Sequence, residues 1–234
     1  MKDDKSKRAR TKPVSVEEIA ETALACIDTE GLEGLTMRKL ARAIGVEPMT
    51  LYRYLPNKEA ILAVVADRLW QELRPFVPEV EGWAEQVRLM WLEMYDLMLQ
   101  HPHAVPLIAR AGTYSATAAE GTARMLGILK DAGFSQELAS EFMHVAGALV
   151  VGFAYAQLWL RLNAQGQRPV SPAGEMGPLP PSLLEWARGV GSSAPWQFAA
   201  ALDMALASFA ERLTGKRADE GTGRTTRPSS NVAL

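Results

Sequence analysis

Polar and aromatic side chains gather on one face of a short helix that the sequence predicts over residues 47–55. This face carries Thr50, Tyr52, Arg53 and Tyr54. Hydroxyl and guanidinium groups hydrogen-bond to phosphate oxygens and to the polar atoms on base edges. The pattern therefore predicts a surface that contacts a nucleic-acid duplex.

A glycine turn and a preceding helix would hold this polar helix in place. Thr36 can cap the preceding helix, and Gly45 can take the left-handed conformation that ends it. Leu51 and Leu55 would anchor the polar helix from behind. The inward face of the preceding helix is apolar at helical spacing, at Met37, Leu40, Ala41 and Ile44. Such a pair of helices lays one helix in the DNA major groove while the other braces it.

Two further helices frame this motif. The first follows a capping box at Ser15–Glu18 and is expected to end at Gly31. The last begins after Pro56 with Asn57 as its cap and ends before the prolines at 75 and 78. We therefore expect a helix-turn-helix domain over residues 15–60, followed by a connecting helix and linker over residues 61–81.

Basic side chains are concentrated at one end of the chain. The net charge is −2, yet residues 1–13 hold six basic against two acidic side chains. Residues 36–58 hold five basic against one acidic side chain, so the remainder is acidic. A basic end on an acidic body orients a molecule toward a polyanion. Residues 1–14 are interpreted as a flexible basic arm, which is either a solvated tail or a segment that follows DNA.

The rest of the chain has helical spacing without any strand pattern, so we expect an all-α fold. Helices are predicted near residues 82–100, 104–112, 117–132, 136–163 and 195–214. They would form a domain over residues 82–214, with a loop at 164–194 that contains a short helix near 183–188. Residues 215–234 are expected to be a disordered tail.

Several functional classes lack their motifs. The sequence has no nucleophile elbow, phosphate-binding loop or zinc-protease motif, and no catalytic set stands out. His101 and His103 flank a proline and do not share a helical face, so neither a metal nor another cofactor is predicted. We expect no membrane span and no signal peptide, and the single Cys26 is expected to be a buried, inert thiol. These features favour a cytoplasmic protein that is not an enzyme, and the alternative is an all-helical enzyme or carrier.

The stretch GLEGLTMRKLARAIGVEPMTLYRYLPNKEAIL resembles the DNA-binding domain of TetR-family transcriptional regulators, most closely the tetracycline-repressor branch. The specific match covers about 60 residues. Weaker similarity continues at Gly82-Trp83, around His101 and at residues 131–135. The resemblance implies a helical ligand-binding and dimerisation domain, and a homodimer bound to pseudo-palindromic double-stranded operator DNA. It also implies that a small-molecule effector releases the DNA.

The resemblance assigns DNA contacts to individual positions of this chain. Base or groove contacts fall on Arg38, Pro48, Met49, Thr50 and Tyr54, and phosphate contacts on Tyr52 and Lys58. Arg53 is interpreted as a general phosphate contact or a solvated charge. The pair Pro48-Met49 departs from the tetracycline repressor, which has a hydrogen-bonding amide followed by proline. Because Met49 can only pack on an apolar group such as a thymine methyl, we expect a different operator.

The effector domain offers an apolar candidate site. Its candidate lining residues are Met90, Trp91, Met94, Tyr95, Met98, Ile108, Arg124, Met125 and Phe153. Each of these could instead belong to the core or, for Arg124, to the surface. Ile108 falls near the position of the repressor's magnesium-binding histidine, and Met90 near its drug-binding amide. A tetracycline–metal ligand is therefore disfavoured, and a hydrophobic effector is expected.

The segment 146–152 is small and apolar, and a second apolar stripe runs along residues 198–209. Small residues allow helices to approach closely, so the two stripes could form an intermolecular four-helix bundle. The alternative is that they pack within one subunit.

Overall fold

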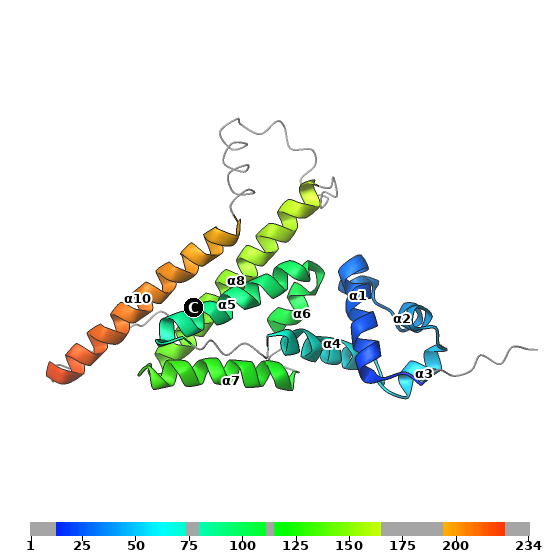
Figure 1. The fold of residues 1–234 in the computed structure, drawn as a ribbon, viewed down its shortest axis with the longest axis horizontal. Coiled ribbons are helices and arrows are strands. Elements are labelled where there is room, and N and C mark those ends of the chain that lie inside the picture. The colour runs from blue at the N-terminus through cyan, green and yellow to red at the C-terminus, as the bar shows by residue number, and fades with distance from the viewer. Residues whose placement is uncertain (1–12, 74–79, 111–114, 165–193, 223–234) are drawn as a thin grey trace, which may run out of the picture. The chain divides into compact units, whose positions relative to one another are not determined.

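The computed structural model describes residues 13–73, 80–110, 115–164 and 194–222. These ranges contain helices and no strand, so the all-α fold is confirmed (Figure 1). The chain divides into two compact units. The first unit comprises residues 1–76 and 96–122, and the second comprises residues 77–95 and 123–234. The predicted loop helix near 183–188 lies outside the described residues.

The first unit begins with four helices that start where the capping residues indicate. They are α1 (Val16–Gly34), α2 (Met37–Ile44), α3 (Pro48–Tyr52) and α4 (Lys58–Glu72). The side chain of Ser15 accepts a hydrogen bond from the Glu18 backbone N–H, at 3.1 Å. Thr36 and Asn57 cap α2 and α4 in the same way. These side chains satisfy backbone donors that the first helical turn leaves unpaired.

Two glycines shape the chain around the helix-turn-helix. Gly45 has φ 83° and ends α2, and its backbone N–H donates to the Ala41 and Arg42 carbonyls. Gly31 has φ 77°, yet helical residues continue to Gly34. The prediction that Gly31 ends the first regular helix agrees with this break, because the Gly31 backbone is non-helical and only a short helical turn follows it within α1. A side chain at either position would strain the left-handed backbone.

A contiguous apolar core holds these four helices together, and α1 packs against both α2 and α4. Its fully enclosed members include Ile19, Ala23, Ile27, Leu40, Leu51, Ile61, Val65 and Leu69. Of these, Leu40 and Leu51 were predicted from the helical spacing. Burying their side chains stabilises the unit by roughly 1.5–3 kcal/mol for each large aliphatic residue.

The first unit also contains a segment that is distant in sequence. It comprises the end of α5 (Trp83–Gln100), η1 (Pro102–Ala104), α6 (Val105–Arg110) and the start of α7 (Ala116–Asp131). The ring nitrogen Nδ1 of His101 lies 2.9 Å from a carboxylate oxygen of Asp28 on α1. Nδ1 of His103 lies 3.0 Å from the Asp28 backbone carbonyl. Residues 96–122 therefore cluster with the N-terminal helices, rather than with the remainder of the predicted 82–214 domain.

The second unit is built on two long helices, α8 (Gln136–Ala164) and α10 (Ala194–Thr222), which pack side by side (Figure 1). Aromatic rings link them: Phe142 meets Phe209 at 5.3 Å between centroids, and Phe153 meets Phe198 at 5.9 Å. Helix α10 continues to Thr222, so the predicted tail is wrong for residues 215–222. Residues 223–234, like the basic arm up to residue 12, lie outside the described residues.

Helix α8 bears on the expectation that no segment could span a membrane. Its stretch Gln136–Leu158 is long and apolar enough to do so by length and composition. The expectation that no apolar segment reaches the length of a membrane span is therefore wrong, as far as length and composition go. The same test is passed by core helices of soluble proteins, and α8 contributes buried Phe142, Ala146 and Val150 to the second unit.

Candidate nucleic-acid interface

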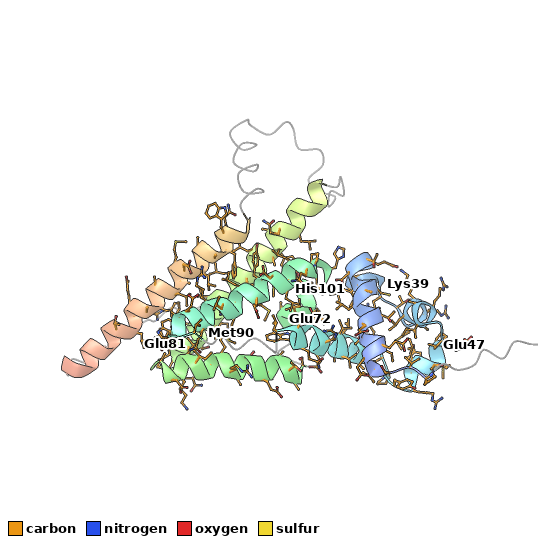
Figure 2. All side chains as sticks on the ribbon, in the orientation of Figure 1. Lys39, Glu47, Glu72, Glu81, Met90 and His101 are labelled. Carbon is orange, nitrogen blue, oxygen red and sulfur yellow. The ribbon has the colours of Figure 1, made fainter. Side chains whose placement is uncertain are left out.

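Helices α2 and α3 present an exposed cationic surface. The side chains of Arg38, Arg42 and Arg53 are all exposed. Lys39, also exposed, pairs with Glu30 of α1, so its charge is partly neutralised within the protein. Figure 2 labels Lys39 on α2 and Glu47 at the start of α3. The surface therefore offers the three arginines as its principal donors to an anionic partner.

Helix α3 divides its side chains between this surface and the core. Met49 is 72% exposed, Tyr52 45% and Tyr54 43%, whereas Leu51 is fully buried. Thr50 is only 9% exposed, so the expectation that it lies on the exposed face is wrong. Consecutive helical positions differ by about 100°, so Thr50 and Leu51 together cover the inward side of this short helix.

The helical part of this segment is shorter than the prediction of residues 47–55. Helix α3 spans Pro48–Tyr52, with proline in its first turn. The backbone N–H groups of Tyr54 and Leu55 both lie 2.9 Å from the Leu51 carbonyl, which closes the helix in a tight turn. Tyr52 and Tyr54 are therefore displayed at the end of the helix and in that turn.

Lys58 forms an internal contact that sequence reasoning missed. Its ammonium Nζ donates a hydrogen bond to the Leu32 carbonyl of α1, at 2.7 Å. This contact explains why a cation stands in the first turn of α4, where the helix dipole disfavours it. Lys58 ties α4 to the kinked end of α1, and this bond uses one of the three N–H donors of its ammonium group. The sequence signals for this contact are the cation in the first turn of α4 and Gly31, which stands next to Leu32.

Cys26 is the single thiol of the chain and lies half-buried on α1. Burial raises the pKa of this thiol, and the nearby Glu30 carboxylate raises it further. The thiolate is the reactive form, so the raised pKa makes this cysteine less reactive at neutral pH than a free thiol. The expectation of an inert thiol agrees with this environment, although Cys26 is less buried than predicted.

The candidate effector residues are divided between the two units. Met90, Trp91, Met94, Tyr95, Arg124, Met125 and Phe153 belong to the second unit, whereas Met98 and Ile108 belong to the first. Most are buried, with Met90 (labelled in Figure 2) and Phe153 half-buried. Arg124 is exposed, which favours its surface interpretation. The indole N–H of Trp91 is buried with no hydrogen-bond acceptor in the described part of the chain.

Charged groups in the second unit pair at its surface. Arg88 of α5 binds both carboxylate oxygens of Asp203 on α10, at 2.6 and 3.4 Å. This carboxylate raises the pKa of the Arg88 guanidinium. No group of three or more His, Cys, Asp or Glu side chains within the described ranges could hold a metal ion.

Comparisons with known proteins agree with this architecture. Residues 19–65 match the family model "Bacterial regulatory proteins, tetR family", and residues 75–207 match "Tetracyclin repressor-like, C-terminal domain". The HTH-type transcriptional repressor DrrR1 of Streptomyces coeruleorubidus is 30% identical over 151 residues. That match covers 62% of this chain and 54% of DrrR1, so the chain spans about half the length of this relative.

Solved structures share the fold at low sequence identity. ActR of Streptomyces coelicolor in complex with actinorhodin is 24% identical, with a TM-score of 0.64 over 86% of this chain and 99% of ActR. BioQ with its double-stranded DNA operator is 21% identical, with a TM-score of 0.57 over 83% of this chain and 99% of BioQ. The two family models together span most of the described chain. This chain therefore belongs to the TetR family and is a DNA-binding transcriptional regulator.

Proposed function

We propose that this regulator is a cytoplasmic homodimeric repressor that binds a pseudo-palindromic operator and releases it when a small hydrophobic effector binds. The observation that carries the proposal is the α2–α3 surface. There, exposed Arg38, Met49 and Tyr52 stand on helices anchored by the fully buried Leu40 and Leu51. Such a surface can enter a major groove without loss of core packing.

The dimer is supported by apolar side chains left exposed on the two long helices. Tyr155 of α8 is 42% exposed, while Trp196 and Met204 of α10 are 63% and 69% exposed. Large exposed apolar groups on neighbouring helices favour an association surface. A second copy of the chain would cover both helices in a four-helix arrangement.

The proposal is tested with duplexes that the purified protein selects from a random-sequence pool. We expect a pseudo-palindrome whose half-sites are about 35 Å apart, or one helical turn. Binding measured by fluorescence anisotropy should weaken by roughly 1000-fold between 50 and 200 mM salt, because phosphate contacts release counterions. A monomeric protein that selects no sequence and binds no duplex at low salt would contradict the proposal.

The effector is expected to be apolar and to bind within the second unit, where Trp91, Met94 and Tyr95 are buried. The solved structure of ActR in complex with actinorhodin supports a small-molecule ligand. Actinorhodin and a panel of aromatic compounds can be screened for loss of operator anisotropy. Compounds that bind the protein and leave operator affinity unchanged would speak against release by an effector.

Met49 is expected to make the operator sensitive to single methyl groups. The side chain is 72% exposed at the start of α3 and has no hydrogen-bonding group. Replacing individual thymines in the selected duplex with uracil removes only the C5 methyl. Uracil at one symmetry-related pair of positions should weaken binding of the duplex by about threefold to tenfold, since a methyl contact contributes about 1 kcal/mol. The Met49→Ala variant should lose this discrimination, and an equal uracil effect in both proteins would contradict the role.

A further inference from the structure

Asp67 of α4 connects that helix to the start of α7. Its carboxylate oxygen Oδ1 accepts a hydrogen bond from the Ser115 hydroxyl at 2.6 Å and from the Thr117 backbone N–H at 3.3 Å. The same Ser115 oxygen accepts from the Ala118 backbone N–H at 3.0 Å, which caps α7. Ser115 is only 3% exposed, so water competes little for these bonds. Hydrogen bonds to a charged group in such surroundings are among the stronger ones.

A close packing contact lies one turn further along both helices. Gly121 of α7 faces the ring of Trp70, and a Cβ at Gly121 would lie 3.0 and 3.3 Å from two ring carbons. Trp70 follows Asp67 by three residues, and Gly121 follows Thr117 by four, so each pair shares a helical face. Helices α4 and α7 are therefore in contact at two points, one turn apart, which restrict both their separation and their relative rotation.

Through α4, this attachment affects the position of the α2–α3 surface, which we call the reading surface of each subunit. Only residues 53–57 separate α3 from α4, and α1 packs along α4. Residues 116–122 of α7 cluster with the DNA-binding helices, whereas residues 123–131 belong to the second unit. Helix α7 is thus one continuous element with residues in both units, and its first turns contact α4.

We infer that Asp67 is a positioning residue, which holds α4 so that the two reading surfaces of the dimer match the spacing of the operator half-sites. The inference rests on the proposed function, since it requires a dimer that binds two half-sites. Without the attachment, α4 would keep its packing against α1 and α6 but lose its link to α7, so a share of the molecules would hold α4 displaced from α7. Apparent affinity for the correctly spaced operator falls in proportion to the fraction of molecules in the competent orientation.

The test compares the selected operator with versions whose half-sites are moved by one or two base pairs, and with a single half-site. For Asp67→Ala we expect about tenfold weaker binding to the selected operator and half-site binding within about twofold of wild type. The preference for the original spacing should flatten. Loss of a carboxylate would by itself strengthen DNA binding, so weaker binding cannot be a charge effect. Glu59→Ala, at an exposed position of the same helix, controls for charge.

A second variant separates positioning from hydrogen bonding. Gly121→Ala places a methyl group against the Trp70 ring, so the ring or α7 must shift by a few tenths of an ångström, while Asp67 and Ser115 are unchanged. We expect the same flattened spacing preference. Gly127→Ala is the matched control, because a Cβ at this α7 position meets no atom within 4 Å. Gly127→Ala should bind every duplex as wild type does.

Two outcomes would overturn the positioning role. One is a wild-type spacing profile in both Asp67→Ala and Gly121→Ala. The other is an equal loss of full-operator and half-site binding, which indicates a damaged DNA-binding domain rather than a displaced one. Failure of the wild-type protein to bind any duplex would instead overturn the proposed function, and the role of Asp67 with it.

Discussion

Replacing Arg38 with alanine is expected to weaken binding to the selected operator by about 100-fold and to relax its base preference. The Arg38 side chain is exposed in the first turn of α2, the helix that packs against α3. A bidentate contact to a guanine contributes about 1–3 kcal/mol, and the dimer would lose two of them. Affinity for the selected operator and for single-base variants of it, measured by anisotropy, checks the result.

Tyr52→Phe provides the contrast for this experiment. Tyr52 is 45% exposed at the end of α3, and its hydroxyl is expected to donate to a phosphate. Removing one phosphate contact should weaken binding to all duplexes by a similar factor, about fivefold, without altering base preference. Unchanged operator affinity in Arg38→Ala, or a base-dependent loss in Tyr52→Phe, would show that these roles are misassigned.

The second large effect is expected at the proposed dimer surface. Met204 of α10 is 69% exposed, and Met204→Glu would place a charge in an apolar interface. We expect the protein to become monomeric by sedimentation velocity. Operator affinity should fall by about 100-fold or more, because the second reading surface would no longer be linked to the first.

Leu126→Glu is the matched control for the dimer experiment. Leu126 lies on α7, is 39% exposed and receives the same apolar-to-acidic change on a helix outside the proposed interface. It should remain dimeric and bind the operator normally. If the Met204→Glu protein stays dimeric, Met204 of α10 does not lie in the dimer interface, whatever the effect of the change on DNA binding.

Local chemistry made much of the first unit predictable. Ser15, Thr36 and Asn57 cap their helices as their residue types indicate, and Gly45 turns the chain as predicted. These features depend on residues within four positions of one another. The period of the apolar residues likewise identified the buried faces, since helix geometry alone determines which positions align.

Contacts between distant segments were not predictable in this way. The Lys58–Leu32 bond joins residues 26 apart, and the Ser115–Asp67 bond joins residues 48 apart. Their existence depends on how helices pack, which a single sequence does not encode in local spacing. The prediction that Thr50 is exposed was wrong for a related reason. Helix α3 is too short for periodicity to separate its two faces.

The solitary cysteine gives the molecule one chemically addressable point. Cys26 sits on α1, within the unit that carries α2 and α3, and the chain has no other thiol. Because burial raises the pKa of this thiol, a maleimide or methanethiosulfonate reagent would need mildly alkaline conditions. A nitroxide attached there would give a symmetric dimer a single spin–spin distance, from which the separation of the two DNA-reading domains could be followed during operator and ligand titrations.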